Sequence, residues 1–317
     1  MHTPAAHTND VTANPLPSLG VDLGGTKIEI VALDACGREL IRRRTSTPRD
    51  DYAATLGAIV TLVEEAESSL GVTSGRCRLG IGTPGSRSRA TGLMRNCNSQ
   101  WLNGKPLGAD LESLLQRTVV IANDANCFAL SEATDGAGEG AESVFGVILG
   151  TGVGGGLVTA GRVRDGCNGI AGEFGHNAMP WPRDAEWPGP PCYCGRSGCI
   201  ETFLSGPGFA ADHARVNGAV MAPTQIVQRA QEGNVACEAS LVRYEERLAR
   251  ALAHVINIVD PDVIVLGGGL SNMDRLYASV PAAWMHWVFS DRVDTRLSKH
   301  LHGDSSGVRG AARLTQR

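Results

Sequence analysis

One histidine and three cysteines lie close together in the second half of the chain, with a glutamate on either side. The four residues are His176, Cys192, Cys194 and Cys199. Three thiolates and one imidazole form the closed, tetrahedral ligand set that zinc takes in structural sites. Gly195 and Gly198 allow the sharp turn that returns the last cysteine to the metal. A closed site leaves no position for a substrate, so we predict a structural zinc that holds Glu173 and Glu201 in place.

The alternative is that these cysteines are unconnected thiols or form disulfides. The chain has nine cysteines, an odd number, and they are spread along its length. Residues 1–18 contain prolines among polar residues, but neither the basic start nor the apolar block of a signal peptide. We therefore expect a disordered tail at residues 1–18, a reducing, cytoplasmic environment, and zinc rather than a disulfide framework.

Three glycine-rich segments follow predicted strands. They are residues 22–27, 149–156 and 267–269. Backbone N–H groups in such turns can bind phosphate oxygens, and the first turn adds the polar side chains of Asp22, Thr26 and Lys27. Each segment alone is more often an ordinary tight turn, and no helix follows the first, so it is not a P-loop. The three together indicate a nucleotide site.

Asn123 and Asp124 stand where a short β-branched run, residues 119–122, meets a predicted helix. In an open α/β sheet, ligands bind at the carboxyl ends of the strands, so a carboxylate here could accept the proton of a substrate hydroxyl. The alternative is that one of the two residues only caps the helix, which is a common role for Asn and Asp. Position alone leaves both roles open.

The hydrophobic pattern predicts the elements that position these residues. Strands are predicted at residues 19–22, 28–33, 39–44, 77–81, 119–122, 144–149, 155–159 and 263–266. Helices are predicted at residues 51–70, 108–117, 123–133, 224–232, 238–259, 273–288 and 307–314. The first three strands form an antiparallel meander, and a strand-turn-strand pattern recurs at residues 144–159. We therefore predict an α/β protein with a mixed sheet in each half and a cleft between the halves.

Length and charge narrow the function classes. A chain of 317 residues exceeds the size at which one core usually stops growing, so two domains are expected. The formal net charge is −4 and the basic residues are scattered, which argues against a nucleic-acid surface. No apolar run approaches the roughly eighteen residues that cross a bilayer. The expected partner is a small molecule, not nucleic acid or membrane.

Taken together, these motifs resemble the ROK family of sugar kinases, within the actin-like ATPase superfamily, over the whole chain after residue 18. The most specific match is to the family's zinc signature, in residues 172–176 with 192–201. Residues 22–27 and 150–156 resemble the first and second phosphate loops, and residues 266–271 resemble the segment that contacts adenosine.

The resemblance implies a two-domain actin-like ATPase (ribonuclease H-like) sugar kinase fold with a structural zinc loop. Residues 19–122 would form the smaller N-terminal domain, joined by a C-terminal helix at residues 306–317. Residues 123–305 would form the larger domain, with its zinc loop at residues 173–201.

The resemblance also implies roles for single residues. Asp124 would be the catalytic base. The sugar site would comprise Gly85, Asn98, Asn123, Asp124, Glu173, His176 and Glu201. The ATP site would comprise Asp22, Gly24, Gly25, Thr26, Lys27, Gly150, Thr151, Gly152, Gly154, Gly267, Gly268 and Gly269. Asp22 would face the Mg²⁺ that accompanies ATP. Gly85 could instead serve a plain β-turn, and Asp22 could be a strand-end turn residue.

Residues 96–104 and 302–312 are most similar to the bacterial fructokinase (mannofructokinase) branch, which implies that ATP phosphorylates the 6-hydroxyl of D-fructose. A glucokinase, a broad hexokinase and an N-acetylhexosamine kinase of the same family are alternatives. A regulator that binds sugar without phosphorylating it is another, but such proteins carry a helix-turn-helix ahead of the first phosphate loop, where residues 1–18 offer none. A homodimer is left open. The loop at residues 177–191 would be a lid, a dimer contact or a spacer.

Overall fold

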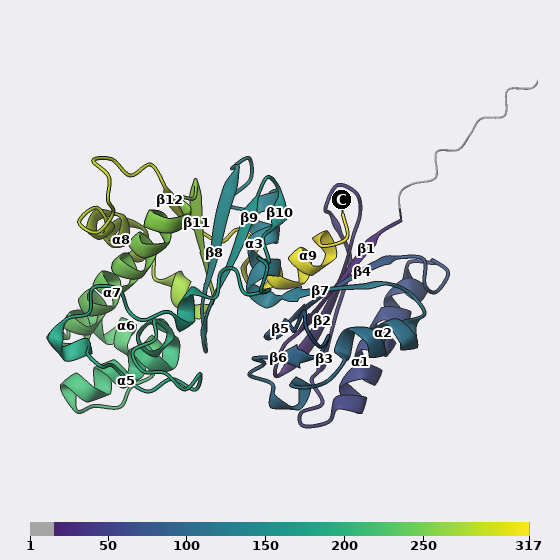
Figure 1. Ribbon diagram of the computed structural model, residues 1–317, viewed down its shortest axis with the longest axis horizontal. Helices are drawn as coiled ribbons and strands as arrows, with labels where there is room; N and C mark the ends of the chain where they lie inside the picture. The colour runs from purple at the N-terminus through teal and green to yellow at the C-terminus, as the bar shows by residue number, and fades with distance from the viewer. Residues whose placement is uncertain (1–15, 317) are drawn as a thin grey trace, which may run out of the picture.

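The computed structural model describes residues 16–316, so most of the tail expected at residues 1–18 lies outside the described residues. Two five-stranded sheets, one in each lobe, carry helices on both faces (Figure 1). Each sheet mixes parallel and antiparallel strands, which confirms the predicted α/β class. Among residues 16–316, no helix has the length and apolar character needed to span a membrane.

The N-terminal lobe is built on a sheet with the strand order β3-β2-β1-β4-β7. Its elements are β1 (Ser18–Leu23), β2 (Lys27–Leu33), β3 (Glu39–Ser46), α1 (Tyr52–Ser69), β4 (Arg78–Thr83), α2 (Leu107–Leu115) and β7 (Val119–Asn123). The first three strands form the predicted antiparallel meander, and β4 and β7 continue the sheet in parallel. Helix α1 packs its apolar face on this sheet, and the Asp51 carboxylate caps it by accepting the Ala54 N–H at 2.9 Å.

The C-terminal lobe has a sheet with the order β10-β9-β8-β11-β12. Its elements are β8 (Ser143–Leu149), β9 (Val153–Thr159), β10 (Arg162–Val163), α4 (Glu201–Leu204), α5 (Gly206–Asn217), α6 (Pro223–Gln231), α7 (Val235–Val259), β11 (Val263–Gly267), α8 (Leu276–Trp284) and β12 (Arg296–Lys299). The sequence prediction omits β10, α4, α5 and β12, and its helix over residues 273–288 is longer than α8. One continuous apolar cluster joins α7 to β8 and β11, and it includes Phe145, Leu252 and Leu266.

Shorter elements complete the chain, and one long loop is firmly held. They are β5 (Ser86–Arg87), β6 (Met94–Arg95) and 3-10 helices at Gln100–Leu102, Phe174–His176, Asp184–Glu186, Gly269–Asn272 and Gly303–Ser305.

The loop 177–191 is held against α7 by Arg250, which is fully buried. Its guanidinium donates to the Trp181 carbonyl and to Glu186, both at 2.8 Å. Much of this loop is therefore part of the lobe's framework.

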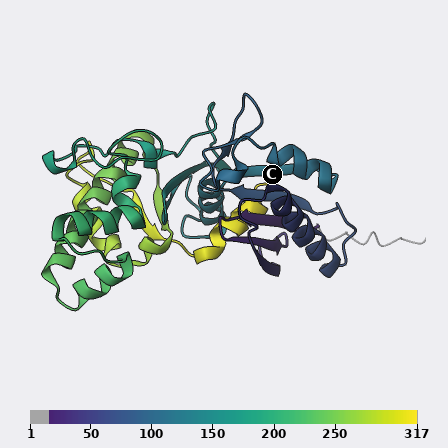
Figure 2. The same cartoon turned by 90° about the horizontal axis from the view of Figure 1, so that it is seen from below.

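Two helices, α3 (Asp124–Asp135) and α9 (Ser306–Arg313), lie between the two sheets (Figure 1). In the perpendicular view the yellow C-terminal helix again lies between the green lobe and the purple strands (Figure 2). Helix α9 packs on β1 and β4, and α3 packs on β8, β9 and α9. Glycine makes this close approach possible, because a Cβ atom at Gly20 would overlap the Val308 carbonyl and one at Gly310 would overlap the Cys127 carbonyl.

Gly310→Ala is expected to lower the free energy of unfolding by about 3 kcal/mol, because the added methyl group would push α9 away from α3. Chemical denaturation followed by circular dichroism measures the change. The matched control is Gly57→Ala, since Gly57 is exposed on α1 with open space around it. Alanine there should leave stability unchanged or raise it by up to about 1 kcal/mol. A Gly310→Ala protein as stable as the wild type would contradict the close packing of the two helices.

Candidate active site

Asp124 is the first residue of α3 and directly follows β7. The side-chain oxygen of Asn123 caps the helix by accepting the Ala125 N–H at 2.9 Å, and Oδ1 of Asp124 accepts the same N–H at 2.8 Å. Asn123 also donates through Nδ2 to the Gly85 carbonyl at 3.3 Å. Because Asn123 already serves as the cap, the capping alternative does not account for a carboxylate at Asp124.

Two carboxylates lie close together at this end of the N-terminal sheet. The pKa of Asp124 is raised to about 6. Burial is the main cause and the charge of Glu173 adds to it, while the hydrogen bond from the Ala125 N–H lowers the pKa. Burial, and then the charge of Asp124, raise the pKa of Asp22 to about 7. Two acids that repel each other form a place where a cation binds favourably.

The first glycine turn joins β1 to β2. The Gly24 N–H donates to the Lys27 carbonyl at 3.0 Å, which closes the turn, and Thr26 is exposed at its tip. The Lys27 ammonium lies 3.4 Å from the buried Glu29 carboxylate. The sequence prediction directed Lys27 to the phosphates, whereas the structure gives its ammonium group a partner on the same strand.

The predicted sugar-binding residues of the N-terminal lobe adjoin this turn. Asn98 is exposed beside the buried Ser99, whose hydroxyl lies 3.4 Å from the position that a Cβ atom on Gly25 would take. Gly85 has a φ of +96°, a conformation that favours glycine, and its carbonyl accepts the Asn123 hydrogen bond. The structure therefore brings Gly85, Asn98 and Asn123 to the same edge of the sheet as Asp124.

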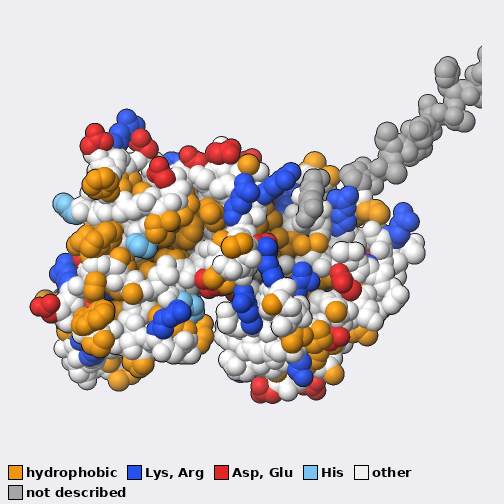
Figure 3. Space-filling model, in the orientation of Figure 1, with side chains coloured by type: hydrophobic (Ala, Val, Ile, Leu, Met, Phe, Trp, Pro, Cys, Tyr) orange, Lys and Arg blue, Asp and Glu red, His pale blue; other side chains and the backbone are white. Residues whose placement is uncertain are grey.

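The second glycine turn joins β8 to β9 and contains Gly150, Thr151, Gly152 and Gly154. The carbonyl of Gly150 accepts the N–H of Gly206 at 2.8 Å, at the start of α5. Gly268 has a φ of +81° and packs against the Leu149 carbonyl, so the third glycine segment, Gly267 to Gly269, lies beside this turn. The strands β1 and β8 both run toward the lower edge of Figure 1, where a notch separates the two lobes in Figure 3.

A cavity of about 710 Å³ lies between the second turn, α5, α6 and the third glycine segment. The residues of its wall that the sequence prediction missed are mostly apolar, and they include Pro207, Ala210, Pro223, Val227 and Met273, whereas Leu270 belongs to the predicted adenosine-contacting segment. An apolar wall beside glycine N–H groups and a helix N-terminus suits a heterocyclic base with phosphates attached. The missed signal was Ser205 before Gly206 and Pro207, since a capping serine followed by proline in the first turn starts a helix.

The four predicted zinc ligands converge. One ligand atom from each of His176, Cys192, Cys194 and Cys199 lies within 4.8 Å of the others. Two of the separations are 3.6 Å, between Cys192 Sγ and His176 Nδ1 and between the sulfurs of Cys194 and Cys199. Ligands around a tetrahedral zinc with Zn–S bonds of about 2.3 Å are separated by roughly 3.8 Å. The donor set and its spacing therefore fit zinc.

The zinc loop also carries Glu173, whose charge acts on Asp124. Glu201 begins α4, and its Oε2 accepts the Val153 N–H of the second turn at 2.9 Å, so it links the loop to that turn. Burial raises the pKa of Glu173. The charge of Glu201 raises this pKa further, and the His176 ring lowers it. His176 was predicted to contact the sugar, and its Nε2 lies 3.0 Å from the Tyr193 hydroxyl. Sequence reasoning missed Tyr193.

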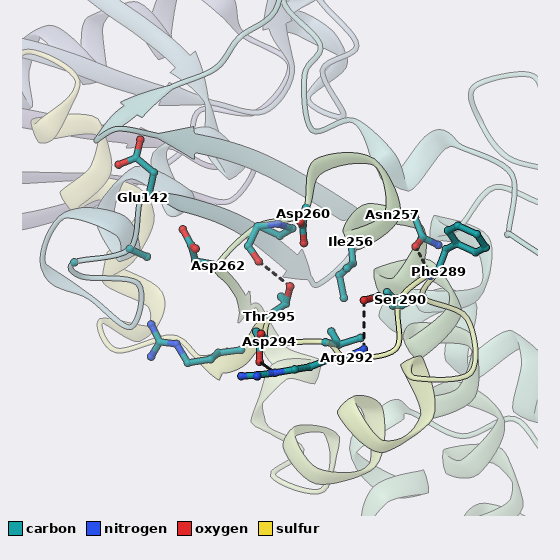
Figure 4. Close-up of a pocket in the computed structure, with 16 residues that line it drawn as sticks. Glu142, Ile256, Asn257, Asp260, Asp262, Phe289, Ser290, Arg292, Asp294 and Thr295 are labelled. Atoms are coloured by element: carbon teal, nitrogen blue, oxygen red, sulfur yellow. Dashed lines mark hydrogen bonds and ion pairs between the residues drawn. The ribbon is translucent and has the colours of Figure 1, made fainter.

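A second cavity, of about 990 Å³, lies elsewhere in the C-terminal lobe (Figure 4). Three of its charged side chains are engaged with neighbours: Asp262 accepts the Ser143 N–H at 2.7 Å, and Arg292 donates to Asp294 at 2.6 Å. None of the predicted site residues lines this cavity. We therefore assign the candidate active site to the glycine turns and the zinc loop, where acids with raised pKa values converge.

Comparisons with known proteins agree on one family. The model of the ROK family matches residues 18–317. An N-acetyl-D-glucosamine kinase from Pectobacterium atrosepticum is 41% identical over 301 residues, which cover 93% of this chain and 97% of that protein. The crystal structure of a ROK hexokinase from Thermus thermophilus superposes with a TM-score of 0.83 at 30% identity, covering 95% of this chain and 97% of that one.

A second solved structure is a ROK family glucokinase from Streptomyces griseus in complex with glucose and AMPPNP. It superposes with a TM-score of 0.74 at 28% identity, covering 94% of this chain and 98% of that one. These matches extend over both lobes and the zinc loop. The two mixed sheets have the arrangement of the actin-like ATPase kinases, and the chain belongs to the ROK family.

Proposed function

We propose that the protein transfers the γ-phosphoryl group of ATP to the 6-hydroxyl group of a hexose. The observation that carries this proposal is the position of Asp124, which stands between the glycine turns and the acids of the zinc loop. Its pKa of about 6 reflects burial and the nearby Glu173 charge. The proposal is also supported by the relatives, which are named as kinases of hexoses and of N-acetyl-D-glucosamine.

Asp124 acts as the base in this proposal. The sugar oxygen forms a bond to the γ-phosphorus while the bond from that phosphorus to the bridging oxygen of ADP breaks, and the carboxylate takes the hydroxyl proton. In a loose transition state the proton leaves late, so a weak base is sufficient. A carboxylate with a pKa of about 6 is largely ionised at pH 7 and is a better acceptor than an ordinary aspartate.

The remaining polar groups bind and orient the substrates. A hexose has several hydroxyls that both donate and accept, so carboxylates and amides from different elements suit it: Asn98, Asn123, Glu173 and Glu201. Zinc, when bound to the loop, supplies rigidity and fixes the tautomer of its histidine. The apolar cavity takes the adenine, and the N–H groups of the two glycine turns take the phosphates. Mg²⁺, which Asp22 would hold through water, supplies charge neutralisation on the triphosphate.

Two sugars are candidate substrates, and one observation supports each of them. D-Fructose is favoured by the motif resemblance of residues 96–104 and 302–312. N-Acetyl-D-glucosamine is favoured by the name of the curated relatives, which are about 41% identical, and this comparison supports it more strongly than fructose. A sugar-binding regulator would have no need of a partly buried carboxylate at the phosphoryl acceptor.

A coupled assay of ADP release tests the proposal, with D-fructose, D-glucose, D-mannose and N-acetyl-D-glucosamine each supplied with MgATP. We expect kcat/KM of about 10⁴ M⁻¹s⁻¹ or more for at least one of them. The phosphorus NMR spectrum of the product should show a 6-phosphate. Hydrolysis of ATP at the same rate without sugar, or transfer to a different hydroxyl, would contradict the proposal.

A further inference from the structure

Tyr193 occupies a place in the candidate sugar site that the proposed mechanism does not use. It lies between two zinc ligands, and its hydroxyl is 3.0 Å from Nε2 of His176. The two rings meet edge to face, with centroids 5.2 Å apart and planes at 88°. Nevertheless the side chain is 69% exposed, so this large ring does not serve as core packing.

The orientation of the His176 ring determines which hydrogen bond the Tyr193 hydroxyl makes. Nδ1 of His176 lies on the side of the metal ligands, 3.6 Å from Cys192 Sγ. A ring bound to metal through Nδ1 carries its proton on Nε2, so Nε2–H donates to the Tyr193 oxygen. The hydrogen of the tyrosine hydroxyl is then free to point into the site. Tyr193 therefore covers the polar atom of His176 that would otherwise face a ligand.

The chemistry of the sugar identifies which part of it meets Tyr193. In a hexopyranose, C2 lies across the ring from C5, the atom that carries C6. If the 6-hydroxyl is held at Asp124, the substituent at C2 points toward the opposite end of the site. Glu173, whose charge acts on Asp124, is connected to His176 by one turn of 3-10 helix, and His176 meets the Tyr193 hydroxyl at the end of that turn. The structure therefore links Asp124 to Tyr193 through Glu173 and His176.

We propose that Tyr193 restricts the space for the substituent at C2, so that the substrates are hexoses without a 2-acetamido group. A hydroxyl at C2 fits beside the tyrosine and can bond to its oxygen, whereas an acetamido group extends three heavy atoms beyond its nitrogen into the volume of the ring. This inference rests on the proposed function, and it separates the two candidate sugars of that proposal. N-Acetyl-D-glucosamine, the sugar named for the curated relatives, is the poorer substrate of this chain.

Glucose and N-acetylglucosamine provide the test, because they differ only at C2. For the wild type we expect kcat/KM for glucose to exceed that for N-acetylglucosamine by about tenfold or more, the size of effect that one misfitting group produces in a pocket. Tyr193→Ala should reduce this ratio by about tenfold. Tyr193→Phe, which keeps the ring and loses only the hydroxyl, should leave the ratio within about threefold of the wild type.

Zinc content and thermal stability are measured for each variant, since the substitution lies between two metal ligands. If Tyr193→Ala does not retain zinc, the comparison is made with Tyr193→Ser. A wild type that prefers N-acetylglucosamine, an unchanged ratio in the truncated variant, or an equal change in Tyr193→Phe would overturn the inference while leaving hexose phosphorylation intact. A wild type that phosphorylates neither sugar nor fructose would instead overturn the proposed function.

Discussion

Asp124→Asn is expected to reduce kcat for sugar phosphorylation by about 10³-fold, with a much smaller change in KM, because the amide keeps the shape of the side chain but accepts no proton. The Asn123 cap of α3 stays in place, so the variant should fold and retain zinc. Steady-state kinetics with MgATP and the best hexose measure the effect. Asp51→Asn is the matched control, since Asp51 only caps α1 and asparagine caps equally well.

The same residue sets a pH dependence. The raised pKa of Asp124 means that its base form is lost as the pH falls through about 6, so kcat/KM should fall about tenfold per pH unit below that point. Asp22, whose pKa is raised to about 7, titrates nearby, so the profile of Asp124→Asn serves as the reference. The residual activity of the variant should lack the limb near pH 6. A wild-type profile that stays flat down to pH 4.5 would contradict the assignment of the base.

Cys194→Ser is expected to remove the zinc and to lower kcat/KM for the sugar by about 100-fold or more, because Glu173 and Glu201 lie at the two ends of the metal loop. Elemental analysis after dialysis should find one zinc per chain in the wild type and little in the variant. The loss should also appear as a lower Tm. The effect follows from folding rather than from chemistry at the metal, since four protein ligands close the site.

Cys36→Ser is the control for the zinc experiment. Cys36 is an exposed free cysteine outside the metal cluster, so serine there should change neither zinc content nor activity. Full zinc content with wild-type activity in Cys194→Ser would contradict the assignment of Cys194 as a zinc ligand. Wild-type activity in the absence of zinc would contradict the structural role of the metal.

Local patterns predicted most of the regular elements of the fold. The meander of β1 to β3 follows from three short β segments separated by recognisable turns, and the mixed sheets follow from the order of strands and helices. The strand β12 was missed because its four residues, Arg296 to Lys299, are mostly polar and are held by pairing with the buried β11. The extent of α8 was overstated because apolar residues continue past Trp284 into a loop.

The candidate site was predictable where its residues carry chemistry in their type and spacing, as in the zinc ligands and the glycine turns. It was not predictable where a role depends on tertiary contacts. The raised pKa of Asp124 requires its burial and the approach of Glu173. In the sequence Tyr193 is only a residue between two cysteines, and its contact with the His176 ring is seen only in the structure. The apolar cavity wall is formed by α5 and α6, which no single motif brings together.

The position of α9 has a consequence for biosynthesis. Val308 and Ala312 of α9 pack on the face of the N-terminal sheet that contains Val31 and Leu33. A nascent chain that ends before Ser306 therefore leaves those β2 side chains uncovered, however early β1 to β3 emerge from the ribosome. The N-terminal lobe is therefore complete only after residues 306–313 have been synthesised, and a polypeptide that lacks them would present that bare sheet to chaperones and proteases.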